Sequence, residues 1–550
     1  MSTPDTTPVA LTLGDAALTL ERLDSCLDRP VRVTISPRAR ERVARGRAWV
    51  EDILARGAVV YGINTGFGHL KNKRISAHQL DQLQENLLIS HAVGVGPPAP
   101  AAIVRFMLLL KSHMLLAGHS GVRIDVVERL ADWLNADLLP VVPTRGSLGA
   151  SGDLAPLAHL VLPLLNRGEF SVAADADADA VGLGTRVVRP AADVAAERGV
   201  EPVRLAAKEG LALINGTQFC AAYAANLAIR ARRLADLADL IYCMSLEGLR
   251  GSARPADERL HALRPHAGAQ RVAANIRRHL RDSEILASHA GCDRVQDPYS
   301  LRCVPQVHGA FRDALAHFCN AVEVEINSVT DNPILFGSGP GIAPGRDAGA
   351  SDGTVRDTAA PSAGDVAADA ISGGNFHAEP LALVLDYLAI ALTDLANISE
   401  RRTYLLLSGE DGLPKLLLRD TGLNSGFMLP QYTAAALLNE CKVLSTPASV
   451  DSIPTSLGQE DHVSMGATSA VKCYEVLDRV ETVLAIEMMC AAQALDFRAP
   501  LKPGAGPRAA HAIVRQTITH ADADRLFGDD MRAALRLVRA SAELRGVARA

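Results

Sequence analysis

Residues 463–496 read VSMGATSAVKCYEVLDRVETVLAIEMMCAAQALD, with apolar side chains recurring at intervals of three and four residues. This spacing places the apolar side chains on one face of an α-helix, and the length of the run predicts a helix of many turns. Four further runs share the pattern, at residues 218–245, 305–330, 376–405 and 429–446. Helices of this length bury their apolar faces against one another. The sequence therefore predicts a mainly α fold with a long-helix bundle at its core.

The composition agrees with packed helices. Hydrophobic residues make up 48% of the 550 positions and aromatic residues only 4%, whereas a β-sandwich needs more Val, Tyr, Phe and Thr. A net charge of −6, spread over the chain, leaves no basic surface for nucleic acid. The most apolar long stretch, residues 378–398, carries Glu379, Asp386 and Asp394, which are costly in lipid and indicate a buried helix with no membrane span.

Cysteine usage and the first residues of the chain concern its compartment. The nine cysteines are scattered and form no CxxC pair. Such a set is typical of buried, reduced thiols and argues against structural zinc. Residues 1–11 show no basic segment followed by an apolar core. We expect a cytoplasmic protein.

Two glycine-rich loops mark a smaller N-terminal part. They are YGINTGFG at residues 61–68 and TRGSLGASGDLAP at residues 144–156. We expect an N-terminal region at residues 1–205 that carries both loops and a helical region at residues 206–550. A flexible loop rich in Gly, Ala, Asp, Ser and Pro is expected inside the second region, at about residues 337–370. Local patterns further predict a strand at 31–35, helices at 37–55, 77–92, 101–116 and 126–138, and a surface excursion at 168–200.

The segment Gly149–Asp153, with the sequence GASGD, permits three interpretations. It nearly matches the G-x-S-x-G nucleophile elbow, but Asp153 replaces the last glycine and no convincing strand precedes it, so a serine hydrolase is poorly supported. Taken alone, the residues favour a capping turn before a short helix at 153–162. The third interpretation is backbone cyclisation, in which the amide nitrogen of Gly152 attacks the carbonyl of Ala150 and loss of two waters leaves Ser151 as an exocyclic methylene. Ring closure needs a small residue before the serine and a glycine after it, because a Cβ at position 152 would obstruct the close approach.

Longer stretches distinguish between these interpretations. Residues 146–159, GSLGASGDLAPLAH, resemble the signature of the aromatic amino acid ammonia-lyases, and in particular of the histidine-directed members. The resemblance continues in order through 61–68, 90–94, 208–217, 296–302, 372–377, 399–402, 452–456 and 459–465, and covers about residues 55–500. It implies a fumarase/ammonia-lyase-like fold and a 4-methylidene-imidazol-5-one group formed from Ala150, Ser151 and Gly152. It also implies that no metal or diffusible cofactor is needed, and that a homotetramer shares its active sites between subunits.

The resemblance also implies roles for single residues. Ser151 would supply the electrophile, Tyr61 would be the base that removes the β-proton of the substrate, and Arg302 would clamp the substrate carboxylate through a bidentate contact. The remaining candidates are Gln296 and Tyr299 beside Arg302, Asn215 near the prosthetic group, Phe376 against the substrate ring, and Gly68 and Asp153 as structural supports. Gln296, Tyr299 and Arg302 are spaced by three, which places them on one face if this segment is helical. Each residue alone has an ordinary interpretation: Tyr61 as a packed loop aromatic, Arg302 as a surface charge, and Asn215 as a helix-terminal turn.

Two residues concern the substrate. Glu460 can accept the N–H of an imidazole, whereas beside a phenyl ring its carboxylate would be desolvated without a partner. His91, in the pair Ser90-His91, likewise resembles the histidine-directed enzymes. The resemblance therefore implies elimination of ammonium from L-histidine to give trans-urocanate. The alternatives are a tyrosine or phenylalanine ammonia-lyase, a 2,3-aminomutase on the same scaffold, or a catalytically silent helical scaffold.

Overall fold

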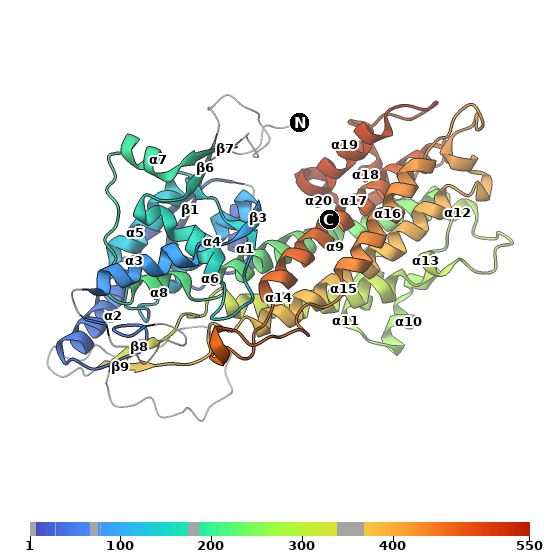
Figure 1. Ribbon diagram of the computed structural model, residues 1–550. Coiled ribbons are helices and arrows are strands. Elements are labelled where there is room, and N and C mark those ends of the chain that lie inside the picture. The colour runs from blue at the N-terminus through green and yellow to red at the C-terminus, as the bar shows by residue number, and fades with distance from the viewer. Residues whose placement is uncertain (1–6, 28, 67–74, 77–78, 174–185, 338–367) are drawn as a thin grey trace. The chain divides into compact units, whose positions relative to one another are not determined.

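The computed structural model describes residues 7–27, 29–66, 75–76, 79–173, 186–337 and 368–550 (Figure 1). The chain forms two compact units. Unit 1 comprises Met1–Asn226, Ala321–Leu383 and Ala448–Val471, and unit 2 comprises Leu227–Asn320, Val384–Pro447 and Lys472–Ala550. Each unit thus combines three stretches that are separated in the sequence. The expected division at residue 205 concerns two consecutive regions, one with the glycine-rich loops and one with the long helices. That division remains a proposal.

Unit 1 contains short strands. β1 (Val9–Leu13) and β2 (Val31–Ile35) pair in parallel with Val9 opposite Val31, so the strand predicted at 31–35 is confirmed. The other pairs are antiparallel: β3 (Val95–Pro98) with β5 (Pro143–Arg145), and β8 (Ile334–Gly337) with β9 (Ala368–Ile371). A three-stranded sheet has the order β4 (Leu139–Pro140), β6 (Glu169–Ala173), β7 (Arg186–Pro190).

The described residues of the surface excursion predicted at 168–200 are mostly exposed or half-buried, but its two ends have regular structure that the prediction did not include. These ends form β6, β7 and the helix α7 (Ala191–Glu197). Phe170 on β6 is buried and meets the Trp133 ring edge-on, with ring centroids 5.2 Å apart. The buried side chain of Phe170 anchors β6, although the polar composition of the segment had indicated an exposed loop. The acidic middle, residues 174–185, lies outside the described residues.

The helices of unit 1 begin and end close to the predicted residues. α2 (Pro37–Ala55) begins where Ser36 Oγ accepts from Ala39 N and proline occupies the first helical position. α4 (Ala101–Leu115) is apolar on nearly every side and buried accordingly. The others are α1 (Leu20–Leu27), α3 (Leu80–His91), α5 (Ile124–Asn135), α6 (Leu154–Val161), the 3₁₀ helix η3 (Leu162–Leu165) and α8 (Glu209–Ile214).

Long helices dominate the rest of the fold, as expected (Figure 1). They are α9 (Gln218–Gly248), α14 (Val304–Glu325), α15 (Glu379–Leu406), α16 (Met428–Leu444) and α17 (Gly466–Asp496), each close to a predicted run. Shorter elements complete unit 2: η4 (Arg254–Ala256), α10 (Glu258–Leu263), α11 (Ala267–His279), α12 (Glu284–Ser288), α13 (Tyr299–Arg302), η5 (Glu410–Gly412), η6 (Lys415–Leu417), α18 (Ala505–Arg515), α19 (Phe527–Ala540) and α20 (Ala542–Arg549). The mainly α expectation is confirmed.

Of the described helices, α15 is the one long and apolar enough to cross a membrane by length and composition. In its most apolar window, 67% of the residues are buried inside the protein. Asp386 on this helix is buried and lies 3.8 Å from the ammonium of Lys472. This burial agrees with the interpretation of residues 378–398 as a core helix.

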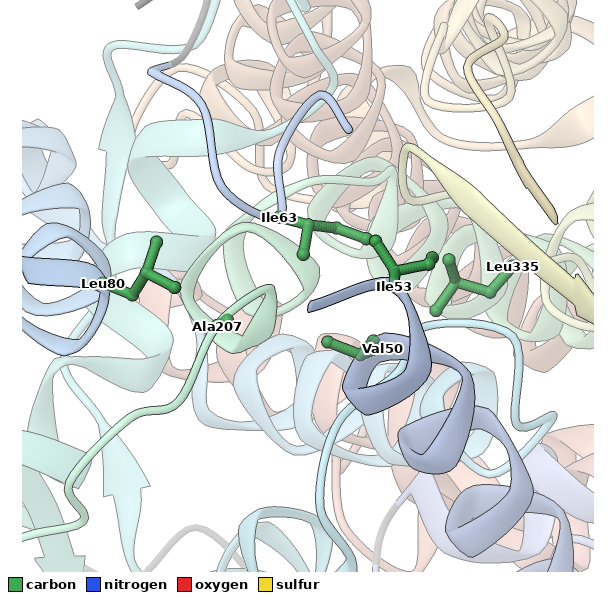
Figure 2. Close-up of a cluster of buried hydrophobic side chains, with 6 residues drawn as sticks. All are labelled: Val50, Ile53, Ile63, Leu80, Ala207 and Leu335. Atoms are coloured by element: carbon green, nitrogen blue, oxygen red, sulfur yellow. The ribbon is translucent and has the colours of Figure 1, made fainter. Parts of the chain in front are cut away.

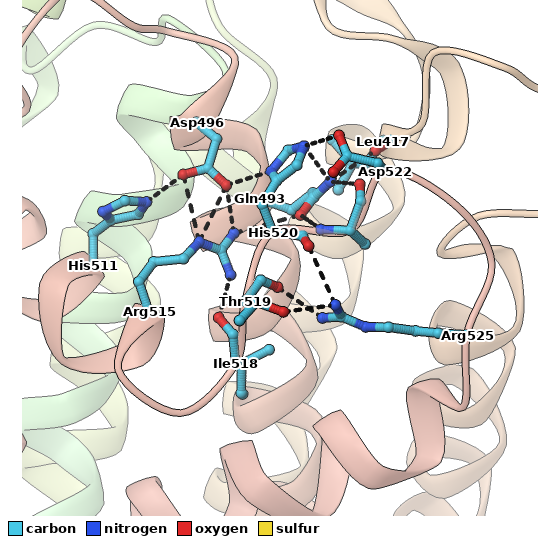
Figure 3. Close-up of polar contacts among 11 residues, drawn as sticks. Leu417, Gln493, Asp496, His511, Arg515, Ile518, Thr519, His520, Asp522 and Arg525 are labelled. Atoms are coloured by element: carbon cyan, nitrogen blue, oxygen red, sulfur yellow. Dashed lines mark hydrogen bonds and ion pairs between the residues drawn. The ribbon is translucent and has the colours of Figure 1, made fainter.

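Buried polar contacts hold the helices of unit 2 together. Arg402 on α15 is fully buried and pairs with Glu487 on α17, whose carboxylate also accepts from Ser399 and Ser245. At the end of α17, Asp496 accepts from His511, Arg515 and His520, which fastens the helix to the segment that begins with α18 (Figure 3). These contacts link α15 and α9 to α17, and link the end of α17 to the segment that follows it.

The cysteines are only partly as expected. Six are buried (Cys26, Cys220, Cys243, Cys441, Cys473 and Cys490), and all nine are free thiols. Cys292 is exposed, and Cys303 and Cys319 are half-buried, so the prediction of uniformly buried thiols is wrong at these three positions. The scattered spacing of the cysteines indicates that they are unpaired, but it does not predict how exposed each thiol is.

Candidate active site

The Ala-Ser-Gly segment forms a tight turn ahead of α6. The amide of Gly152 donates to the carbonyl of Gly149 over 3.3 Å. Ser151 has a φ of +54° and Gly152 a φ of +80°, so two consecutive residues adopt the left-handed conformation. A short strand, β5, does precede this loop, which the sequence did not reveal. The turn folds the backbone back on itself, which ring closure between residues 150 and 152 requires.

The close approach of Gly216 explains the glycine at position 152. Gly152 and Gly216 form an isolated parallel bridge, and Asp153 N donates to the carbonyl oxygen of Gly216 over 2.7 Å. A Cβ on Gly152 would lie 2.7 Å from the carbonyl carbon of Gly216 and still closer to its oxygen. The segment therefore fits the steric requirement of cyclisation that the sequence predicted.

Asn215 reaches the same turn from the end of α8. Its Nδ2 donates to the carbonyl of Ser151 over 2.5 Å, and the residue is 2% exposed. Its Oδ1 is buried and has no hydrogen-bond partner among the described residues. A buried unpaired amide oxygen is costly, so this atom is available to a donor on a prosthetic group or a substrate.

Asp153 lies under the turn at the first turn of α9. Its buried carboxylate accepts from the backbone N–H of Cys220 at 2.9 Å and from the Cys220 thiol at 3.1 Å. Burial raises the pKa of Asp153 to about 6, against the opposing effect of these hydrogen bonds. The carboxylate contacts the positive end of a helix. It ties the turn to α9, in agreement with the supporting role predicted for it.

His91 and Glu460 are close enough to interact electrostatically within unit 1. His91 is the last residue of α3, and its Nδ1 lies 3.0 Å from Ser90 Oγ. Burial lowers the pKa of His91, while the Glu460 carboxylate acts in the opposite direction. Glu460 follows the 3₁₀ helix η7 (Ser456–Gly458), and its Oε2 accepts from Thr455 Oγ1 over 3.3 Å.

The loop that begins at Tyr61 is anchored by its neighbours. Tyr61 itself is half-buried, and Ile63 is fully buried in a cluster with Val50, Ile53, Leu80, Ala207 and Leu335 (Figure 2). Asn64 Oδ1 accepts from Val60 N, and Asn64 Nδ2 donates to Ala58 O. These contacts fix the backbone next to Tyr61. Gly68, a predicted support, lies outside the described residues.

Phe376 lies in unit 1 between β9 and α15 and is half-buried. The glycine-rich segment before it is fastened to Asn332, whose Oδ1 accepts from Gly373 N over 2.8 Å and whose Nδ2 donates to Ser372 Oγ over 3.0 Å. Two hydrogen bonds from a single side chain thus hold the backbone that leads to Phe376.

Gln296, Tyr299 and Arg302 lie together in unit 2. The guanidinium of Arg302 is 4.5 Å from the centroid of the Tyr299 ring. With its amide oxygen facing Arg302, Gln296 accepts from Nη1 at 2.6 Å and Nη2 at 3.1 Å. The prediction of one helical face is wrong, because α13 begins only at Tyr299 and Pro298 separates it from Gln296. Gln296 lies in the non-helical segment before α13, whereas Tyr299 and Arg302 lie in the single turn of α13.

Some residues around the turn were missed by sequence reasoning. A Cβ on Gly149 would collide with Ser464, and Met465 N donates to Leu148 O, so the start of α17 borders the turn. Lys111 donates to two carbonyls, one of which belongs to Asn215. The lysine inside the apolar run of residues 101–116 could have indicated a buried polar contact. The local sequence around Ser464 contains no pattern that predicts its contact with Gly149.

The sequence pattern of the aromatic amino acid lyases matches residues 18–516. The chain belongs to this family. It is similar to a histidine ammonia-lyase of Gloeobacter violaceus, with 47% identity over 530 residues that cover 96% of this chain and 95% of the relative.

Solved structures of the family share the fold. The histidine ammonia-lyase from Trypanosoma cruzi superposes with a TM-score of 0.84 at 38% identity, covering 98% of this chain and 95% of that one. A tyrosine aminomutase from Streptomyces globisporus superposes with a TM-score of 0.83 at 32% identity, covering 99% of both chains. Because enzymes of both names share this backbone, the fold alone does not select the substrate.

Proposed function

We propose that this chain is an ammonia-lyase that converts L-histidine into trans-urocanate and ammonium. The observation that carries the proposal is the 47% identity, over 96% of the chain, to a protein named as a histidine ammonia-lyase. The geometry of unit 1 supports it, because a turn suited to ring closure lies in the same unit as His91 and Glu460.

The electrophile is a 4-methylidene-imidazol-5-one group built from Ala150, Ser151 and Gly152. This group supplies an electron sink that no ordinary side chain provides. The chain's own residues prepare its formation: the left-handed turn bends the backbone, the missing Cβ of Gly152 admits Gly216, and Asn215 holds the Ser151 carbonyl. No metal and no diffusible cofactor take part in the proposal.

The remaining residues bind the substrate and move its proton. Tyr61, held by the anchored loop, removes the β-proton, and Phe376 packs against the substrate ring. Arg302 binds the carboxylate through its two terminal nitrogens, with Gln296 and Tyr299 orienting the guanidinium. We further propose a cytoplasmic homotetramer whose active sites combine segments from several subunits, with an amino acid as its small-molecule partner and neither nucleic acid nor membrane involved.

Specificity for histidine follows from Glu460 and His91. A carboxylate that accepts the imidazole N–H favours histidine over phenylalanine, because the phenyl ring would leave Glu460 desolvated and unpaired. A tyrosine or phenylalanine lyase, or an aminomutase, is the alternative on the same fold.

The test is incubation of the purified chain with L-histidine, L-tyrosine and L-phenylalanine, each followed by the ultraviolet absorbance of its unsaturated product. We expect urocanate from histidine and far slower reactions with the other two. Ser151→Ala is the matched control, since it keeps the turn and removes the hydroxyl that becomes the methylene. A preference for tyrosine or phenylalanine would overturn the histidine assignment, and a fully active Ser151→Ala chain would overturn the electrophile.

A further inference from the structure

Lys111 is a buried basic residue for which the proposed chemistry has no role. It lies in α4, its side chain is completely buried, and apolar residues surround it along the helix. Burying an ammonium group is costly unless it is paired and hydrogen-bonded. The free energy of desolvation must therefore be offset by contacts, and those contacts show what Lys111 holds.

The contacts are with the end of α8. Lys111 Nζ donates to the carbonyl of Ala212 at 3.1 Å and to the carbonyl of Asn215 at 2.9 Å. The last carbonyls of a helix have no partner within the helix, so a lysine that reaches them acts as a cap. The neighbouring carboxylate of Asp331 is paired with Lys208 instead, at 2.9 Å and with both side chains buried. Lys111 is thus committed to backbone carbonyls.

Asn215, which accepts a hydrogen bond from Lys111, also donates one to the Ala-Ser-Gly turn. Asn215 accepts from Lys111 through its backbone carbonyl and donates to the Ser151 carbonyl through its side chain. The next residue, Gly216, accepts from Asp153 N and borders Gly152. The peptide Asn215–Gly216 therefore contacts the turn on both sides of Gly152, and Lys111 is its support from behind.

We propose that Lys111 is a positioning residue for maturation: it fixes the Asn215–Gly216 peptide so that Ser151 and Gly152 are held in the geometry for ring closure. The proposal rests on the proposed function, since it presupposes that the turn cyclises. Ring closure joins the Gly152 nitrogen to the Ala150 carbonyl carbon and releases two waters in all, with no oxidant or reductant, so Lys111 need supply only geometry.

The test is Lys111→Met, which keeps the length of the aliphatic part of the side chain and removes its donors. After brief expression, the intact mass of the purified chain is followed with time, and the fraction that has lost two waters gives the rate of maturation. We expect the rate to fall about tenfold or more, because the variant loses both hydrogen bonds that hold the carbonyls of Ala212 and Asn215. A merely stabilising role would lower the melting temperature without changing this rate in the folded protein.

Arg498→Met is the matched control. Arg498 is also a buried cation that donates to a helix-terminal carbonyl, that of Gly248 at the end of α9, but it lies in unit 2. This variant should lose stability and still mature at the normal rate. Maturation slowed equally in both variants would overturn the proposal, because the effect would then be general.

Two further variants keep the test decisive. Lys111→Arg retains the donors and should restore most of the maturation rate, and Lys111→Gln, whose amide donors lie on a shorter side chain, should give an intermediate rate. If Lys111→Met does not fold, the Gln variant decides: a normal rate in that variant refutes the positioning role. A wild-type chain that never loses water would refute the proposed electrophile itself, which distinguishes the two failures.

Discussion

Replacing Gly152 by alanine is the sharpest perturbation of the turn. The added Cβ would meet the backbone of Gly216, with its carbonyl carbon at 2.7 Å. Because the obstacle is backbone and not the end of a flexible side chain, the turn or the Asn215–Gly216 peptide must move. We expect Gly152→Ala to fold and to remain uncyclised.

The energetic cost has two parts. An alanine at a φ near +80° costs about 1–2 kcal/mol relative to glycine. A displaced Gly216 also loses its hydrogen bond from Asp153, which is worth about 0.5–1.5 kcal/mol. The sum is roughly 1.5–3.5 kcal/mol from both sources together.

Gly412→Ala separates the cost of the backbone torsion from the cost of the steric contact. Gly412 has a φ of +77°, and no atom lies within 4 Å of the Cβ position. Urea unfolding should therefore show a loss of about 1–2 kcal/mol from the torsion alone, and intact mass should show the normal loss of two waters. A Gly152→Ala chain that matures normally, or a Gly412→Ala chain that does not, would refute the steric reasoning.

Four other outcomes follow from the same contacts. Arg302→Lys should raise KM for the amino acid, by a factor corresponding to roughly 1.5–3 kcal/mol, because a point charge replaces a two-bond fork; unchanged steady-state kinetics would mean that Arg302 does not bind substrate. Tyr61→Phe should depress kcat with little change in KM, and a normal kcat would exclude Tyr61 as the base. Glu460→Gln should reduce kcat/KM for histidine far more than for phenylalanine, and equal losses would remove its role in specificity. Burial lowers the pKa of Lys111 from 10.5 to about 7, against the opposing charge of Asp331, so between those pH values the unfolded chain binds a proton that the folded chain has released. The free energy of unfolding should therefore rise with pH between about 7 and 10.5, by up to about 1.4 kcal/mol per pH unit, and Lys111 should contribute no further change below pH 7, where both states are protonated; urea midpoints that show the same slope in Lys111→Met would contradict this.

The helices were predictable because their information is local. The apolar spacing of residues 463–496 defined α17 to within three residues at its start, and Pro37 marked the beginning of α2. Predictions failed where a residue spacing matched a helix but the segment was not helical. Gln296 and Arg302 share a three-residue spacing with Tyr299, yet α13 begins only at Tyr299. Gln296 therefore lies outside the helix, and its contact with Arg302 does not come from a shared helical face.

The steric requirement at the turn was predictable from the sequence, whereas its supporting contacts were predictable only in part. Steric reasoning about ring closure predicted the need for glycine at position 152, and the structure supplies the obstacle, Gly216. Lys111 and Asn215 are 104 residues apart, and only the tertiary fold brings them together. A lysine in an apolar helix signals that a partner exists, but local sequence cannot name it.

The turn is assembled from distant parts of the chain, and this bears on when maturation can occur. Residues 148–153 are held by Asn215 and Gly216, by Cys220 at the start of α9, and by the segment around Ser464. A nascent chain lacks the complete set of these contacts until residue 465 has been made and folded against the rest of unit 1. Under the proposed function, the loss of two waters is therefore an irreversible chemical record that the chain has folded. In any preparation, the fraction of chains that have this mass counts the molecules in which unit 1 has closed around the turn at least once.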